Sequence, residues 1–195
     1  MFVSFEGLDG CGKTTQARLL AETLAADGVE VVLTREPGGT PLGEQVRDLV
    51  LHGDHVAPWA EAALYAASRA QHVVEVIRPA LERGATVVCD RYLDSSVAYQ
   101  GGGRGLGVDA VLELNLAAVE GLLPDRTVLV EVDVGTALSR VGDERDRIEQ
   151  AGGAFWPVVA ETYRELAARF PERYVVVDGR LPVDELAAEV RGHLR

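Results

Sequence analysis

The sequence predicts an α/β domain built on a five-stranded parallel sheet that is flanked by helices. Short apolar runs rich in β-branched residues alternate along the chain with longer stretches of helical periodicity. This alternation is typical of parallel strands joined by right-handed helical crossovers. The chain has 195 residues, 47% of them hydrophobic, which is enough for the core of one domain.

Each strand is expected from a short run that can be buried on both faces. The runs cover residues 2–5, 29–33, 86–89, 127–132 and 174–177. The expected helices cover residues 12–26, 43–52, 58–83, 109–121, 135–141, 154–169 and 183–194. Pro79 is expected to kink the third helix or to mark its last turns.

Three irregular segments are expected beside strand ends, at residues 34–40, 90–107 and 142–153. Any one of these segments could be an ordinary solvated turn. However, all three follow a strand or a strand-helix pair, as the phosphate loop does, and ligands of open α/β sheets lie beyond the carboxyl ends of the strands. Three such loops together therefore favour a binding site.

The segment after the first run carries the clearest chemical signal. Residues 7–14 read Gly-Leu-Asp-Gly-Cys-Gly-Lys-Thr and fit the pattern G-x-x-x-x-G-K-[ST], whose backbone N–H groups surround nucleotide phosphates. Lys13 is the only lysine among nineteen cationic residues, and a compact ammonium can follow a moving phosphoryl group. The motif stands between a strand and a helix, as a P-loop requires. The sequence therefore predicts a P-loop NTPase fold that binds a nucleotide through Gly7, Leu8, Asp9, Gly10, Cys11, Gly12, Lys13, Thr14 and Thr15.

Composition narrows the class of partner. The formal net charge is −12, which argues against a nucleic-acid surface and requires any phosphate site to be a local cationic cluster. The two cysteines, Cys11 and Cys89, match no metal-ligand spacing or disulfide framework. No apolar run approaches membrane-spanning length, and the chain starts directly with a strand, so a cytoplasmic protein is expected.

Charged residues follow two of the predicted strands. Asp90 comes directly after the third run, where it can hold Mg²⁺ with the Thr14 hydroxyl, directly or through water. Arg91 beside it can grip a phosphate, and an ordinary surface Asp-Arg pair is the alternative. Arg35 precedes a turn fixed by Pro37 and two glycines, and it is expected to face the same crevice.

Two aromatic segments are candidates for binding a base. Tyr65 and Arg69 lie four residues apart on a predicted helix and share one face, so a ring and a guanidinium could bind one base together. Core packing beside a solvent-facing arginine is the alternative. Residues 99–105 read Tyr-Gln-Gly-Gly-Gly-Arg-Gly, and these glycines allow a ligand or a partner to approach the backbone closely.

A dense mixed-charge segment contains Arg140, Arg145 and Arg147. It is interpreted as a lid that closes over phosphates with Gly142 as hinge, and a solvated turn is the alternative. Because the phosphate loop holds no cation besides Lys13, the lid is expected to supply the arginine that stabilises the transferring group. Arg145 is the first candidate and Arg140 the second.

Six motifs in this order resemble the bacterial thymidylate kinases almost from end to end. They are residues 5–10 with 12–16, then 34–40, 68–72, 90–92, 99–105 and 146–149. The resemblance implies one P-loop kinase domain over residues 1–195, with a lid at about 142–153. It also implies Mg²⁺-dependent, in-line phosphorylation of dTMP to dTDP by ATP, in a homodimer.

The resemblance also implies roles for single residues. Catalysis would fall to Lys13, Arg91, Arg145 and Arg140, and Mg²⁺ to Thr14 and Asp90. The acceptor dTMP would contact Asp9, Arg35, Tyr65, Arg69, Arg91, Ser96, Tyr99 and Gln100. Among these, Arg35 and Arg91 would hold its phosphate, Tyr65 would stack on thymine, and Tyr99 would crowd the 2′ position. One departure is that Gly142 stands roughly where relatives carry a lid arginine.

Two other functions fit the same fold. One is a small kinase that acts on a different nucleoside, nucleotide or small acid. The other is a regulatory or assembly ATPase that uses ATP as a switch and hydrolyses it without a monophosphate acceptor. The chain lacks the N-K-x-D motif that reads guanine, which weighs against a GTPase switch.

Overall fold

A computed structural model describes residues 1–141, 147–148 and 152–194, and it has the predicted parallel sheet at its centre. The strand order is β2-β3-β1-β4-β5, and every neighbouring pair is parallel. The strands are β1 (Phe2–Glu6), β2 (Val31–Arg35), β3 (Thr86–Asp90), β4 (Arg126–Glu131) and β5 (Tyr174–Asp178). The predicted fold class is confirmed.

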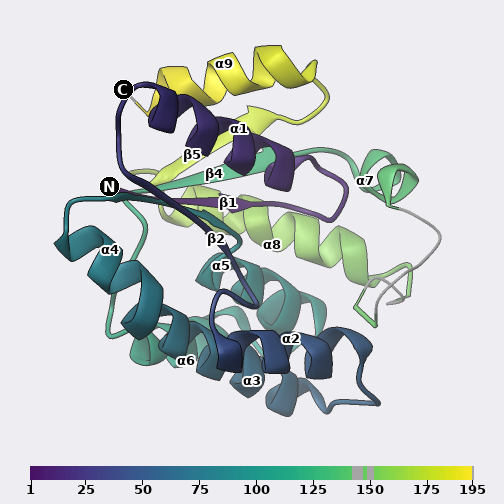
Figure 1. The fold of residues 1–195 in the computed structure, drawn as a ribbon. Coiled ribbons are helices and arrows are strands. Elements are labelled where there is room, and N and C mark those ends of the chain that lie inside the picture. Colours follow the sequence, from purple (N-terminus) through teal and green to yellow (C-terminus); the bar gives the residue numbers. More distant parts are fainter. Residues whose placement is uncertain (142–146, 149–151, 195) are drawn as a thin grey trace.

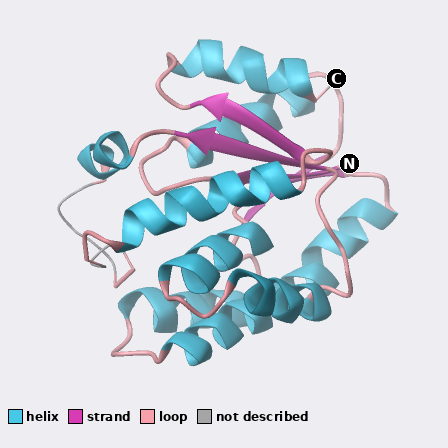
Figure 2. Cartoon of the chain, turned by 180° about the vertical axis from the view of Figure 1, so that it is seen from behind, coloured by secondary structure: helices cyan, strands magenta, loops and turns pink. Residues whose placement is uncertain are grey.

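Helices cover both faces of this sheet (Figures 1 and 2). One face carries α1 (Lys13–Ala26) and α9 (Val183–His193). The other carries α3 (Pro58–His72), η1 (Val73–Ile77), α4 (Arg78–Glu82), α5 (Leu93–Ser96), η2 (Val97–Gly103), α6 (Val108–Ala118) and α8 (Phe155–Arg169). Two further helices are α2 (Pro41–His52), which packs on α3, and α7 (Val134–Arg140).

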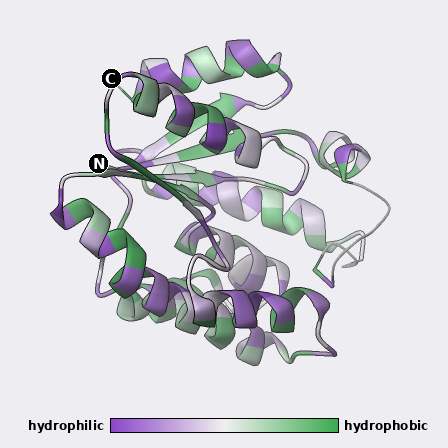
Figure 3. Cartoon of the chain, in the orientation of Figure 1, coloured by the Kyte–Doolittle hydropathy of each residue, from purple (hydrophilic) through white to green (hydrophobic). Residues whose placement is uncertain are grey.

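The core is formed by the strands and the helix faces turned toward them. Val3, Phe5, Val87, Val88 and Val128 are fully buried, and the strands stand out as hydrophobic in Figure 3. No helix within the described residues is long and apolar enough to cross a bilayer.

All five strands end in charged residues at one edge of the sheet. These residues are Glu6, Arg35, Asp90, Glu131 and Asp178. In the strand register, Asp90 pairs with Phe5 of β1 on one side and with Arg35 of β2 on the other. Buried strands therefore deliver ionisable groups to the edge where a ligand of this fold is expected.

The second strand begins two residues later than predicted, at Val31 rather than Val29. The Val29 N–H donates to the Leu24 carbonyl at 3.0 Å and closes the end of α1. Val29 is therefore used by the helix, and Arg35 becomes the last residue of β2 instead of the start of a loop.

The third helix is confirmed, with a wide turn at η1 between α3 and α4. The Arg78 N–H donates to the Val73 carbonyl, one residue further back than in an α-helix. Pro79 follows this turn, three residues before α4 ends at Glu82.

The segment 90–107 was predicted to be irregular, and that is wrong. It contains α5 and continues into η2, which holds Tyr99 and Gln100. Two of the three glycines of η2 face α8: a Cβ on Gly102 would overlap the Thr162 hydroxyl, and one on Gly103 would lie 2.5 Å from Cε2 of Phe155. The close approach that these glycines allow is to the chain's own helix.

The predicted lid, residues 142–153, lies mostly outside the described residues. The structure describes residues 147–148 and 152–153 of it.

Candidate active site

The phosphate loop joins β1 to α1 and leaves the start of that helix open. Gly12 lies in the left-handed region with φ +100° and begins α1 with no side-chain cap. The first N–H groups of a helix have no partner within it, so they face the loop and can bind an anion. At the other end of the loop, a Cβ on Gly7 would lie 2.6 Å from the Val130 carbonyl oxygen. Glycine is therefore required at Gly7 for packing.

Lys13 folds back across this loop. Its side chain is 7% exposed, and Nζ donates to the Leu8 carbonyl oxygen and to Asp9 Oδ1, both at 3.2 Å. The ammonium is therefore held inside the loop, where phosphate oxygens would replace these acceptors.

Thr14 and Asp90 form the oxygen pair predicted to hold Mg²⁺. The Thr14 hydroxyl donates to Asp90 Oδ2 at 2.5 Å, while Asp90 Oδ1 is buried without a hydrogen-bond partner among the described residues. A hydroxyl and a carboxylate with a free oxygen suit a hard cation that keeps several waters and binds phosphates. These two side chains therefore fit Mg²⁺.

A second group of possible metal ligands is a hydrogen-bond network instead. Glu36, His72 and Cys89 are buried, and each has one atom that could bind a metal within 4.8 Å of the corresponding atoms of the other two. However, His72 Nδ1 lies 2.9 Å from Glu36 Oε1, and its Nε2 lies 2.7 Å from the Thr34 hydroxyl, so both ring nitrogens are occupied.

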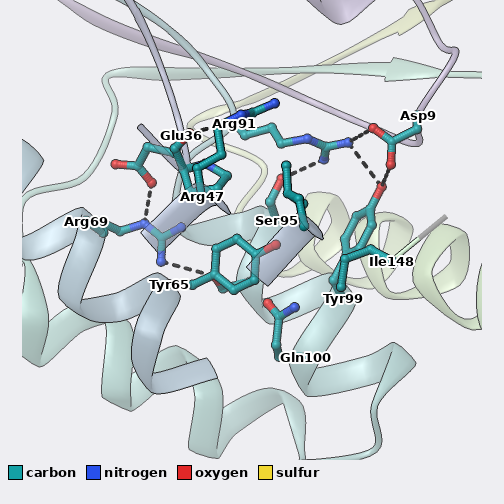
Figure 4. Close-up of a pocket in the computed structure, with 13 residues that line it drawn as sticks. Asp9, Glu36, Arg47, Tyr65, Arg69, Arg91, Ser95, Tyr99, Gln100 and Ile148 are labelled. Atoms are coloured by element: carbon teal, nitrogen blue, oxygen red, sulfur yellow. Dashed lines mark hydrogen bonds and ion pairs between the residues drawn. The ribbon is translucent and has the colours of Figure 1, made fainter. Parts of the chain in front are cut away.

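A pocket beside the phosphate loop collects most of the predicted substrate residues (Figure 4). Of those predicted, it is lined by Asp9, Tyr65, Arg69, Arg91, Ser96, Tyr99 and Gln100. The remaining lining residues are Glu36, Pro37, Arg47, Leu51, Ser95 and Ile148. Asp9 belongs to both the loop and the pocket, so the two sites are continuous.

Arg91, Asp9 and Tyr99 form the charged wall of this pocket. Arg91 Nη2 donates to Asp9 Oδ1 and, at 3.1 Å, to the Tyr99 hydroxyl, which in turn donates to Asp9 Oδ2 at 3.0 Å. Burial would raise the pKa of Asp9, but Arg91 and Lys13 outweigh it and hold that pKa well below its ordinary value. Asp9 therefore stays ionised and neutralises part of the charge of two cations.

Arg69 is buried, so the alternative of a solvent-facing arginine is wrong. It is 1% exposed, and its Nε donates to Glu36 Oε2 at 2.6 Å. Further contacts run to Ser96 Oγ, Asn115 Oδ1 and the Tyr92 carbonyl oxygen. A guanidinium has five N–H groups, so these four contacts fix its plane, and among the described residues one donor on Nη2 has no acceptor. Arg69 can therefore present one oriented N–H to a ligand in the pocket.

The comparisons with known proteins agree with this geometry. A family model described as thymidylate kinase matches residues 5–190. The chain belongs to the thymidylate kinase family. The thymidylate kinase of Leifsonia xyli subsp. xyli is 55% identical over 199 residues, covering 100% of this chain and 94% of that protein. That of Clavibacter sepedonicus is 52% identical over 195 residues, covering 98% and 92%. The crystal structure of thymidylate kinase from Ehrlichia chaffeensis superposes with a TM-score of 0.81 at 36% identity, covering 100% of this chain and 98% of that one.

One predicted substrate residue of this family member lies outside the pocket. Arg35 has a side chain that is 54% exposed, and its Nη2 lies 3.0 Å from Glu44 Oε2. It lines a neighbouring groove with Thr14 and Asp90. Arg35 is the last residue of β2, so its side chain extends from the end of the sheet. The contact of Arg35 with the dTMP phosphate stays a prediction.

The lid arginines are partly described. Arg140 Nη1 donates to the Gly179 carbonyl oxygen at 3.0 Å. If Gly10 carried a Cβ, that atom would lie 3.2 Å from the Cβ of Arg140, so Arg140 lies against the phosphate loop. Arg147 donates from Nη2 to Glu61 Oε2 at 2.6 Å and from Nε to the Val50 carbonyl at 2.9 Å. Arg145 and Gly142 lie outside the described residues.

Sequence reasoning missed several residues of the pocket and its support. Glu36 lies inside the motif at residues 34–40, and Ser95 lies inside the segment 90–107, so their positions were a usable signal. Arg47 and Glu61 had none, since a single charged residue in a helix is most often exposed.

Proposed function

We propose that this protein phosphorylates dTMP to dTDP with ATP, by direct in-line transfer, in the synthesis of dTTP. The observation that carries the proposal is the continuity of the phosphate loop with the pocket through Asp9. A donor phosphate on the loop and an acceptor phosphate beside Arg91 would then be neighbours, as in-line transfer requires. The family names of its relatives support the same reaction.

Each side of the acceptor has a matching group in the pocket. Arg91 supplies a cation for the phosphate, with its guanidinium already oriented by Asp9 and Ser95. Tyr65 offers a ring to stack on the base, and the fifth N–H of Arg69, which has no acceptor within the described part of the chain, offers a donor to its edge. Ser96 and Gln100 complete the base pocket, and Tyr99 is proposed to crowd the 2′ position of the sugar.

On the donor side, Lys13 and the first N–H groups of α1 are proposed to bind the ATP phosphates, together with the rest of residues 7–15. Thr14 and Asp90 would hold Mg²⁺, which neutralises charge on the phosphates when it is bound. Asp90 Oδ1, buried and without a partner among the described residues, supports this assignment.

The lid at about residues 142–153 is proposed to supply the arginine that stabilises the transferring phosphoryl group. Arg145 is the first candidate and Arg140 the second. Arg145→Ala should lower kcat far more than it weakens dTMP binding, because the contact forms mainly in the transition state. If Arg145→Ala and Arg140→Ala both keep kcat within about threefold of wild type, less than about 1 kcal/mol of barrier, the lid proposal is wrong.

One assay separates the three functions. The purified protein is supplied with ATP, Mg²⁺ and, in turn, dTMP, dUMP, dCMP, AMP, CMP and GMP, and nucleoside diphosphate formation is measured. We expect dTMP to be strongly preferred over AMP, CMP and GMP. Equal turnover of a purine monophosphate would indicate a different kinase, and ATP hydrolysis independent of every acceptor would indicate a switch ATPase.

We further propose one P-loop domain over residues 1–195, working as a homodimer in the cytoplasm. Exposed apolar side chains on α2, α3 and η1 support self-association: Leu42, Leu49, Trp59 and Val74. Sedimentation equilibrium measures the assembly, and a mass of one chain of 20.9 kDa at micromolar concentration would contradict the dimer.

A further inference from the structure

Glu61 is a buried carboxylate at the back of the base pocket. It lies on α3, one turn before Tyr65, and is 0% exposed. Its Oε1 accepts from Gln100 Nε2 at 2.9 Å and from Arg104 Nε at 3.2 Å, and its Oε2 accepts from Arg147 Nη2 at 2.6 Å. A carboxylate buried so completely is tolerated only when such donors surround it.

This carboxylate decides which end of the Gln100 amide faces the pocket. A side-chain amide has a donor end and an acceptor end of nearly equal shape, so packing alone does not distinguish them. An ionised carboxylate accepts and cannot donate, so it must take the NH₂ end. The oxygen end then belongs to the pocket that Gln100 lines, and Figure 4 shows the amide turned toward Tyr65 and the pocket.

An acceptor at this position, next to the oriented N–H of Arg69, matches one class of pyrimidine. A 2,4-dioxopyrimidine presents an N3–H donor beside an O4 acceptor, which pairs with both groups. A 4-aminopyrimidine presents the reverse pattern, an N3 acceptor beside an N4 donor, and leaves both pocket groups facing a like group. An unpaired buried polar group typically costs about 1–3 kcal/mol, which corresponds to about 5- to 150-fold in affinity.

We propose that Glu61 is a positioning residue that sets the preference for a 2,4-dioxopyrimidine over a 4-aminopyrimidine, acting through the Gln100 amide without touching the base. The inference rests on the proposed function, since it takes the pocket beside Asp9 to hold the base of the acceptor. It identifies a residue behind the pocket that determines whether the Gln100 amide presents an acceptor or a donor to the base.

The same contacts predict what Glu61→Gln does. The substituted amide has one oxygen and one NH₂ group. Arg147 makes the shortest contact, so the oxygen stays toward Arg147 and the NH₂ group takes the place of Oε1. That NH₂ group needs an acceptor, so the Gln100 amide turns over and presents its own NH₂ to the pocket. Arg104, whose side chain is 23% exposed, can move its Nε toward solvent.

The experiment measures Kd for dTMP and for dCMP by calorimetry without ATP, and the melting temperature of each variant. In Glu61→Gln the ratio of Kd for dCMP to Kd for dTMP should fall at least about tenfold, a change of about 1.4 kcal/mol. Arg104→Gln removes another partner of Glu61 and leaves the contact with Gln100, so this matched control should keep the wild-type ratio within about twofold.

A reciprocal exchange tests the orientation directly. Gln100→Glu places two carboxylates against each other and should weaken dTMP binding. Adding Glu61→Gln to it lets the amide introduced at position 61 donate to the carboxylate introduced by Gln100→Glu, whose second oxygen again faces the base. The double variant should therefore bind dTMP at least about tenfold more tightly than Gln100→Glu, a comparison that stands even if Glu61→Gln alone does not fold.

The outcomes separate this inference from the function on which it rests. If the wild-type protein binds dTMP no more tightly than AMP, the proposed function fails first. If the wild-type protein selects dTMP, but folded Glu61→Gln keeps the wild-type ratio or the double variant binds no better than Gln100→Glu, then Glu61 does not position Gln100 and the inference is overturned.

Discussion

Glu6, the last residue of β1, makes the stability of this protein depend on pH near neutrality. Its side chain is fully buried and accepts from the Tyr92 N–H at 2.7 Å, Ser95 Oγ at 2.5 Å and the Tyr163 hydroxyl at 3.0 Å. Burial, and after it the charge of Asp94, raise the pKa of Glu6 from 4.5 to about 7. We therefore predict that Glu6→Gln, which cannot ionise, changes the pH dependence of unfolding.

The sign follows from proton binding. Between pH 4.5 and about 7 the folded state binds the Glu6 proton more tightly than the unfolded chain does. The contribution of Glu6 to the free energy of unfolding is therefore fully present below pH 4.5 and is lost as the pH rises through about 7. Each pKa unit corresponds to about 1.36 kcal/mol, so the full loss is about 3 kcal/mol.

Glutamine fits the same site without this loss. Its oxygen can accept from the Tyr92 N–H, and its NH₂ group can donate to the hydroxyls of Ser95 and Tyr163, which can accept as well as donate. As the pH rises from 5 to 8, the free energy of unfolding of Glu6→Gln should therefore increase by about 2.5 kcal/mol relative to that of the wild type.

Urea unfolding of both proteins at pH 5, 6, 7 and 8 measures this difference, and contributions from unchanged groups cancel. Glu131→Gln is the matched control, the same substitution at the end of β4 on a side chain that is 38% exposed. A difference between Glu6→Gln and wild type that stays constant within about 0.5 kcal/mol from pH 5 to pH 8 would refute the reasoning.

Three further predictions concern the loop, the sugar and the packing of η2. Lys13→Arg should lower kcat by about 10²–10³-fold in a folded protein although it keeps the charge, because the buried loop holds a compact ammonium; near-normal kcat by steady-state assay would contradict this. Tyr99→Ala should reduce the preference in kcat/KM for dTMP over its ribo analogue, while Tyr99→Phe, which keeps the ring, should retain that preference. If the two variants have equal ratios, the Tyr99 ring does not discriminate deoxyribose from ribose. Gly102→Ala should destabilise the fold by about 1–3 kcal/mol, because its Cβ overlaps Thr162 of α8. The control Gly192→Ala, in open space on α9, should be neutral or stabilise by up to about 1 kcal/mol, and equal denaturation midpoints for the two variants would exclude the clash.

The features that the sequence predicted well are those governed by local rules. The phosphate loop follows from glycine and lysine spacing, and the strands follow from short apolar runs, so both were found at their correct places along the chain. The start of β2 was misplaced because Val29 has the composition of a strand residue, while its N–H is used to end α1. Composition does not indicate which of two adjoining elements takes a backbone donor.

The features that could not be predicted depend on contacts between distant residues. Glu61 stands among alanines in a helix, and its burial becomes visible only when Gln100 and Arg147 meet it in the fold. Gly102 and Gly103 of η2 were interpreted as room for a ligand or a partner, whereas α8 fills that room from more than fifty residues further along the chain. In both cases the residue type was informative, but its partner was not encoded nearby.

The glycines of η2 also bear on the order in which the pocket can form. Each glycine in a helix costs about 0.5–1 kcal/mol relative to alanine, so Val97–Gly103 is a poor helix until α8 docks against it. During synthesis from the N-terminus, the phosphate loop, β2 and β3 leave the ribosome long before Phe155–Arg169 does. The wall that carries Tyr99 and Gln100 must therefore wait for α8, so a nascent chain holds its complete phosphate-binding motif well before it can recognise a base.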